Sequence, residues 1–146
     1  MTIKLLRVTA LLAVLTGGWS CAGDGTGLDT LGNPLGSTVP LGPTLAGIQD
    51  NIFTPICTQC HTGAAAPLGL ALDAGVSFQN LVGVSSVEKP EMRRVQAGNP
   101  DASYIMWKIE GRAGIVGERM PRGLPPLSAE QIAAVRGWIQ SGAAAN

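Results

Sequence analysis

Two cysteines and a histidine stand close together as Cys57, Cys60 and His61, in the spacing C-x-x-C-H. Thiols three positions apart on one helical turn face the same side, so each can add to one vinyl group of a single porphyrin. The histidine that follows then lies beneath the iron, where its imidazole can act as the proximal ligand. The spacing therefore predicts covalent attachment of one c-type haem.

The same residues have two alternative interpretations: a zinc site, or a disulfide between the two cysteines that is followed by a histidine. A structural zinc site takes about four ligands, but His61 is the only histidine and Cys21 is the only further cysteine. The haem interpretation is therefore preferred over zinc and over a catalytic or structural disulfide.

The composition suggests that the chain needs a large apolar cofactor. Its 146 residues include 20 glycines, and only 4% of them are aromatic. Such a chain builds a thin core for a domain of about a hundred residues, a size at which burial is marginal. We therefore expect the apo form to be poorly folded. The charged residues amount to only 14% and the formal net charge is zero, so nothing indicates a nucleic-acid-binding surface.

Residues 1–20 resemble an export signal, with Lys4 and Arg7 ahead of an apolar run at residues 8–15. That run is too short to span a bilayer, which needs about 20 residues, so we expect the segment to be removed before Cys21. The position of Cys21 also resembles a bacterial lipobox, in which the cysteine is lipidated and anchors the protein to the membrane. A soluble secreted form is the alternative.

Residues 21–43 are rich in glycine and proline and show neither a helical nor a strand period, which is typical of a flexible tether. A disordered N-terminus without a mechanical role is an equally good interpretation. Ala22, rather than an aspartate, follows Cys21, which favours anchoring to the outer membrane over the inner one. Residues 44–146 then form the folded domain.

Four helical segments are predicted in this domain from capping residues and apolar repeats. The first is interrupted by Pro55 just before the cysteines, and Gly111 and Gly142 end the third and the fourth. The last helix should cross the first. The predicted capping residues are Thr44, Asp73, Asn99 with Pro100, and Ser128 with Gln131 as a capping box.

Met120 is the candidate for the second axial ligand of the iron. It lies in a predicted loop, residues 111–126, that holds four glycines and three prolines, so its thioether can approach a metal. Met1 leaves with the signal, Met92 lies in a charged stretch, and Met106 falls in a predicted helix, where methionine is usually a core residue. Met106 as ligand and an open or water-bound sixth site remain the alternatives.

Further residues are candidates for the wall of the haem pocket. Pro67 and Leu70 lie in a predicted strip of this wall, and the Pro67 carbonyl is a candidate acceptor for the Nδ1 proton of His61. An ordinary loop proline is the alternative. Tyr104 is a candidate donor to a haem propionate, although packing explains it as well, and Trp138 of the last helix is included among the haem-contacting residues.

Taken together, these motifs resemble the class I c-type cytochrome domain, and in particular the small single-haem domains of bacterial cell envelopes. The resemblance covers about residues 45–143. It rests on the order and separation of six motifs: Ile52-Phe53, Cys57 to His61, Gly69-Leu70-Ala71-Leu72, Ser103-Tyr104 with Lys108, Met120-Pro121, and Trp138-Ile139 with Gly142-Ala143.

The resemblance implies an all-α fold, a cytochrome c-like bundle of three to five helices around one covalent haem c, with His61 and Met120 as axial ligands. It implies an electron-transfer protein rather than an enzyme. Such a protein would be exported to the periplasm and would exchange electrons with donor and acceptor proteins of the envelope. The haem edge could be surrounded by the basic side chains of Lys108, Arg119 and Arg122, and Arg94 could reach a propionate. The preferred interpretation of all four residues is nevertheless that of charges exposed to solvent.

Two other functions stay open. One is a haem gas sensor or small peroxidase with an open sixth site, although no distal histidine is available to assist peroxide cleavage. The other is a haem-stapled interaction subunit of a larger envelope redox complex.

Overall fold

The computed structural model describes residues 41–146. These residues are rich in helix and contain no strand, only isolated β-bridges, which agrees with the expected all-α class. None of their helices is long and apolar enough to cross a membrane. The predicted signal at residues 1–20, the lipidation site Cys21 and nearly all of the tether lie outside the described residues.

The first helix begins as predicted at Thr44, whose side chain accepts a hydrogen bond from the Gly47 amide at 3.1 Å. It is not one regular helix: α1 (Leu45–Ile48) runs directly into a π-helical turn, η1 (Gln49–Phe53). Its apolar stripe is buried, with Ile48 fully enclosed. The stripe anchors the segment that delivers the two cysteines.

Short turns follow: η2 (Cys57–Gln59), η3 (Pro67–Gly69) and the helix α2 (Ser77–Leu81). The prediction that Asp73 caps α2 is wrong, because Val76 precedes that helix without any side-chain cap. The Asp73 carboxylate instead accepts from the Thr62 hydroxyl at 2.5 Å and from the Gly63 amide at 2.8 Å. Asp73 therefore stabilises the loop directly after His61.

The third predicted helix is divided into η4 (Pro100–Ala102) and α3 (Tyr104–Glu110). Asn99 caps η4 as predicted, accepting from the Ala102 amide at 3.1 Å. The division falls at Ser103, whose extended backbone interrupts the helix. Gly111 ends α3 in the left-handed region at φ +70°, as predicted.

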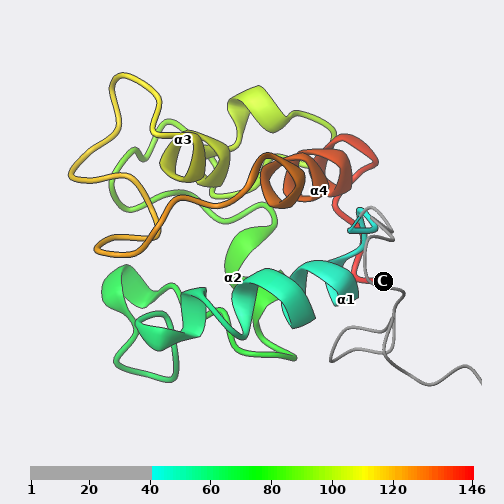
Figure 1. Cartoon of the computed structure of the whole chain (residues 1–146). Helices are drawn as coiled ribbons and strands as arrows, with labels where there is room; N and C mark the ends of the chain where they lie inside the picture. The colour runs from blue at the N-terminus through cyan, green and yellow to red at the C-terminus, as the bar shows by residue number, and fades with distance from the viewer. Residues whose placement is uncertain (1–40) are drawn as a thin grey trace, which may run out of the picture. The chain divides into compact units, whose positions relative to one another are not determined.

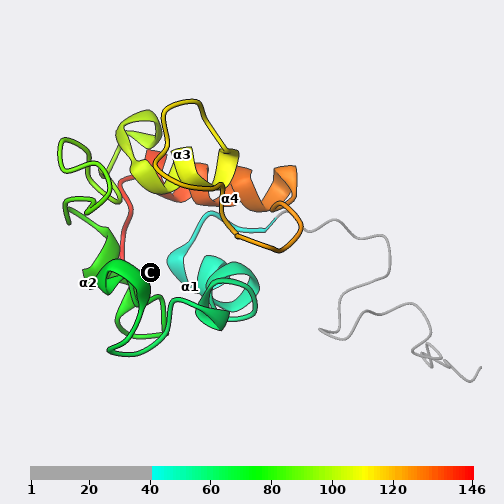
Figure 2. The same ribbon diagram turned by 90° about the vertical axis from the view of Figure 1, so that its left-hand side faces the viewer.

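The last helix, α4 (Ala129–Gln140), begins with the predicted capping box between Ser128 and Gln131. It contacts both α3 and α1, so the expected crossing over the first helix is confirmed (Figures 1 and 2). α3 and α4 form one layer and α1 lies below them. The buried core between these layers includes Ile48, Ile52, Phe53, Met106, Val135, Trp138 and Ile139.

The connection from Val84 to Gln96 is irregular, as expected, but it is not merely a surface segment. Val95 is fully buried, and its amide donates to the Leu81 carbonyl at 3.1 Å. The connection is therefore fixed against the core on its way to α3.

Candidate functional site

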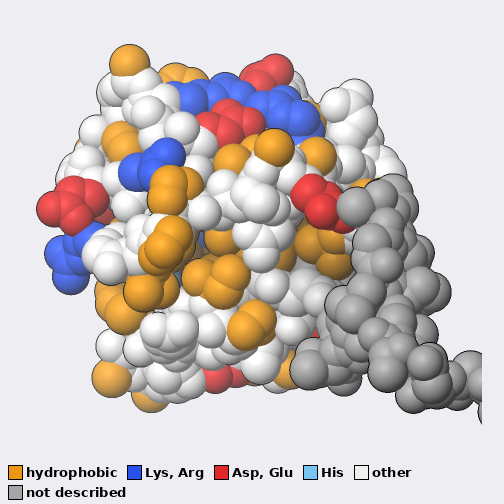
Figure 3. Space-filling view, in the orientation of Figure 1, with side chains coloured by type: hydrophobic (Ala, Val, Ile, Leu, Met, Phe, Trp, Pro, Cys, Tyr) orange, Lys and Arg blue, Asp and Glu red, His pale blue; other side chains and the backbone are white. Residues whose placement is uncertain are grey.

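A cavity of about 400 Å³ lies between the segment that carries the cysteines and the layer of α3 and its following loop. Its size falls within the range of roughly 300–1,000 Å³ that small-molecule and cofactor sites occupy. The wall is largely aliphatic and aromatic, and hydrophobic side chains are also exposed across the face of the molecule in Figure 3. The apolar lining residues include Ile52, Phe53, Ile56, Leu68, Leu70, Leu72, Leu81, Val87, Ile105, Ile109, Leu124, Leu127 and Val135.

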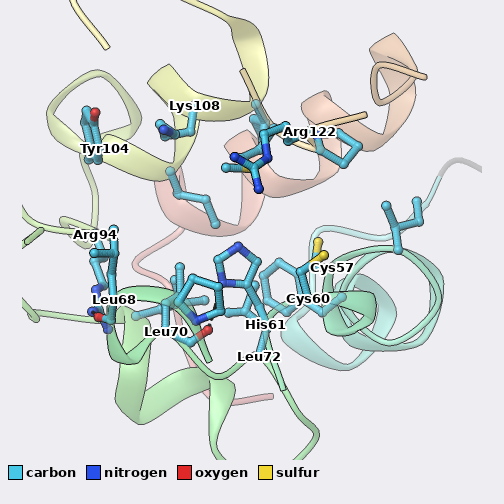
Figure 4. A pocket seen from close by; sticks show the side chains of 18 of the residues that line it. Cys57, Cys60, His61, Leu68, Leu70, Leu72, Arg94, Tyr104, Lys108 and Arg122 are labelled. Carbon is cyan, nitrogen blue, oxygen red and sulfur yellow. Dashed lines mark hydrogen bonds between the residues drawn. The ribbon is translucent and has the colours of Figure 1, made fainter. Parts of the chain in front are cut away.

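Cys57, Cys60 and His61 all line this cavity. Cys57 is the first residue of the turn η2, and Cys60 caps its C-terminal end. The His61 amide continues the turn by donating to the Cys57 carbonyl at 2.9 Å. The two thiols are not joined in a disulfide. Figure 4 shows the His61 ring projecting into the cavity toward the side on which Lys108 and Arg122 lie.

The Nδ1 atom of His61 lies 3.0 Å from the carbonyl oxygen of Leu70. A carbonyl can only accept, so this contact requires Nδ1 to carry the proton and leaves Nε2 of the neutral ring with a free lone pair. The sequence prediction that Pro67 supplies this acceptor is wrong. The Pro67 carbonyl accepts from the Leu70 amide at 3.1 Å instead, although both residues line the cavity as predicted.

Burial raises the pKa of the Cys57 thiol to about 11. Catalytic dithiols depend on a thiolate, and their reactive cysteine accordingly has a pKa below the ordinary value. The raised pKa therefore disfavours Cys57 as the reactive thiolate of a catalytic dithiol and is typical of a thiol in an apolar pocket.

Met120 also lines the cavity. Its amide donates to the Lys108 carbonyl at 2.9 Å, which ties the loop after α3 to the last turn of that helix. Of the three methionines in residues 41–146, Met120 alone lines the cavity: Met106 is fully buried in the core, and Met92 is also absent from the lining.

The polar part of the wall is built around Lys108. Its ammonium donates to the Glu88 carboxylate at 2.9 Å and to the Val116 carbonyl at 2.7 Å. The Tyr104 hydroxyl accepts from the Val116 amide at 2.9 Å. Lys108 is only 8% exposed, so the prediction of a solvated charge is wrong for this lysine. Tyr104 lines the cavity as predicted. Arg122 lines it too, but its side chain is exposed, in agreement with the preferred interpretation of a solvated charge.

Trp138 is not among the residues that line the cavity, which contradicts its predicted role as a haem contact. It is fully buried in the core, and its indole N–H donates to the Ala144 carbonyl at 2.7 Å. The side chain belongs to the apolar face of α4 and packs in the core between the helix layers, and the Ala144 carbonyl satisfies its one polar atom.

Sequence reasoning missed one group of lining residues and set Arg94 aside as a solvated charge. Ser86, Val87 and Glu88 come from the irregular connection before α3, where no periodic pattern marks them. Arg94 also lines the cavity, and its guanidinium makes hydrogen bonds to three backbone carbonyls. The preferred interpretation of Arg94 as a solvated charge is therefore wrong.

Within residues 41–146 no group of three or more His, Cys, Asp or Glu side chains is placed to hold a metal ion by itself. Comparison with models of known families, with characterised proteins and with solved structures found no match to this chain.

Proposed function

We propose that this chain is a single-haem c-type cytochrome that carries one electron at a time in the bacterial cell envelope. One observation carries the proposal: the two thiols, the imidazole and the thioether singled out from the sequence all line one apolar cavity. They come from segments about sixty residues apart in the chain. The finer fold that goes with this function is a class I cytochrome c bundle around the porphyrin.

The side chains of the cavity fit a haem c. Cys57 and Cys60 would hold it by two thioether bonds, and His61 can present a free Nε2 because its Nδ1 faces the Leu70 carbonyl. Met120 would supply the sixth ligand. Arg122 lines the cavity and makes no salt bridge within the described part of the chain, so it is available to a haem carboxylate.

Haem c, when bound, supplies an iron centre that can gain and lose one electron. The chain contributes ligands and surroundings. A thioether ligand and apolar burial favour the ferrous state and raise the reduction potential. Two protein ligands leave no open position for oxygen or peroxide, which favours a carrier over a sensor or peroxidase. Export and lipidation of Cys21 belong to the same proposal and would anchor the carrier at the outer membrane, facing its redox partners.

Covalent haem attachment tests this function directly. The full chain is produced in a bacterium that matures c-type cytochromes, and the denatured protein is examined by mass spectrometry and by haem staining. We expect one haem per chain, retained after denaturation. The variant Cys57→Ser with Cys60→Ser should lose it, whereas the matched control Cys21→Ser should keep it. A wild-type chain without covalent haem would refute the proposal.

A further inference from the structure

Arg94 reaches from the connection before α3 to the turn that precedes the His61 acceptor. Its Nη2 donates to the Leu68 carbonyl at 2.7 Å, and its Nη1 donates to the Asn80 carbonyl at 2.8 Å and to the Gly69 carbonyl at 3.3 Å. One guanidinium thus joins two segments of backbone. Figure 4 shows Arg94 beside Leu68 at the edge of the cavity.

The turn that Arg94 holds has an unfavourable backbone conformation. Leu68 lies in the left-handed region at φ +56°, and Gly69 follows at φ +63°. A residue with a Cβ atom rarely adopts this conformation, so its surroundings must maintain it. The Leu68 side chain is 52% exposed, which makes its burial a weak restraint. Two backbone hydrogen bonds inside the turn, from the Gly69 and Leu70 amides, help to hold it, and the hydrogen bonds from Arg94 are the side-chain restraint that the structure adds.

The backbone of Arg94 is itself fixed. Its amide donates to the Val84 carbonyl at 2.7 Å, and its carbonyl accepts from the Ile105 amide at 3.1 Å. The next residue, Val95, is fully buried. The guanidinium therefore extends from an anchored point toward the turn.

The next carbonyl along the turn belongs to Leu70, which faces Nδ1 of His61 at 3.0 Å. We propose that Arg94 is a positioning residue that fixes the turn at residues 67–70, so that the Leu70 carbonyl holds the His61 imidazole and tunes its donation to the iron. This inference rests on the proposed function. Hydrogen bonding at the second ring nitrogen of a ligating histidine orients the ring and raises its basicity.

The effect on the reduction potential distinguishes positioning from simple charge. A weaker bond to the Leu70 carbonyl makes the imidazole a poorer donor, which destabilises the ferric state and raises the potential. Loss of a positive charge near the iron stabilises the ferric state and lowers it. Arg94→Lys keeps the charge but lacks the planar fork that reaches several carbonyls, so we expect its potential to rise. Arg94→Gln combines the two opposing effects, so its reduction potential should be lower than that of Arg94→Lys.

Amide hydrogen exchange tests the first step without reference to the iron. The amides of Gly69 and Leu70 bond to carbonyls inside the turn at 3.0 and 3.1 Å. In Arg94→Lys we expect both to exchange about tenfold faster, the ratio that ~1.4 kcal/mol of lost hydrogen bonding gives. The matched control is Arg93→Lys. Arg93 donates to the Gly83 carbonyl and the Ser85 hydroxyl but not to the turn. The reduction potential of Arg93→Lys and its amide exchange rates at Gly69 and Leu70 should therefore match those of the wild type.

Unchanged exchange at Gly69 and Leu70 in Arg94→Lys would overturn the inference, even with haem attached. So would a potential that stays level or falls in that variant. A wild-type chain that attaches no haem would instead refute the proposed function, and with it the tuning of iron, whereas the exchange rates would still decide whether Arg94 holds the turn.

Discussion

At the residue scale, Lys108 and Glu88 form an ion pair that is almost enclosed beside the cavity. Their side chains are 10% and 21% exposed, and their charged atoms lie 2.9 Å apart. Removing one partner of a buried pair leaves the other charge without compensation, which commonly costs roughly 3–5 kcal/mol. The remaining exposure of Glu88 moderates that penalty here.

We therefore expect Lys108→Met to lower the free energy of unfolding by about 2 kcal/mol, measured by urea denaturation of the haem-loaded protein. Adding Glu88→Gln should recover part of the loss, because it removes the unpaired carboxylate. The control is Lys89→Met, whose partner Glu91 is 66% exposed and whose effect should stay within about 1 kcal/mol. Equal losses for both lysines would contradict the importance of the enclosed pair.

Among the residues of the cavity, the two cysteines, His61 and Met120 could be singled out from the sequence, because their types and spacing are themselves the signal. The acceptor of the His61 proton could not. Which carbonyl faces Nδ1 depends on the path of the turn, and the positive φ values of Leu68 and Gly69 bring Leu70 rather than Pro67 to the ring. The prediction that Trp138 contacts the haem was wrong for another reason. An apolar stripe on a helix does not distinguish a residue in the core from one in the wall of a pocket.

At the element scale, η4, α3 and α4 are joined by a network of two acids and two arginines. Arg112 and Arg136 both donate to Asp101, at 2.7 and 3.2 Å, and both donate to Glu110. Hydrogen bonds from Arg112 and then Arg136 lower the pKa of Asp101. Burial alone would raise the pKa of Glu110, but the bonds from Arg136 and Arg112 outweigh it and lower that pKa as well.

Because both acids have lowered pKa values when folded, their contribution to stability is fully present above their ordinary pKa values of about 4. It is lost as the pH falls through the folded values. We expect the wild-type free energy of unfolding to decrease more steeply below about pH 4 than that of Asp101→Asn with Glu110→Gln. Urea denaturation across this range measures both slopes. Parallel slopes would show that the network does not stabilise the packing of α3 on α4.

Helix ends were more predictable than helix interiors. The predicted helix termini were found at Thr44, Asn99, Gly111 and Ser128. Each of these residues acts on unpaired backbone groups of the helix end that lie within a few residues of it, so the signal is local. The π-helical turn η1 was not predictable from local pattern. There, the buried Gln49 side chain donates to the Leu72 carbonyl at 2.9 Å and accepts from the Ser77 hydroxyl at 2.7 Å, which are contacts made only in the folded chain.

At the scale of the whole molecule, an apolar cavity of about 400 Å³ lies beside the buried core of the described residues. Protein interiors are otherwise close-packed, with few voids larger than a water molecule. A porphyrin would fill this space and link the layer of α3 and α4 to the segment that carries the cysteines. Without it, aliphatic side chains of both walls would face water.

We therefore expect the haem-free variant Cys57→Ser with Cys60→Ser to unfold without a cooperative transition and to bind a hydrophobic dye. Calorimetry and dye fluorescence, compared with the haem-loaded wild type, measure this. A cooperative, native-like melt of the haem-free variant would mean that the protein core suffices and that the cavity is a preformed pocket.

The central claim, that His61 and Met120 together make this cavity the site of a six-coordinate haem, is tested most directly by the visible spectrum of the purified protein. The ferric wild type should show the weak long-wavelength band of methionine sulfur bound to iron. Met120→Ala should lose this band and have a lower reduction potential, because the thioether favours the ferrous state. Met106→Leu, a volume-conserving change in the core, should keep both. A wild-type spectrum without the band, with carbon monoxide binding readily to the ferrous form, would contradict the account and indicate an open sixth site.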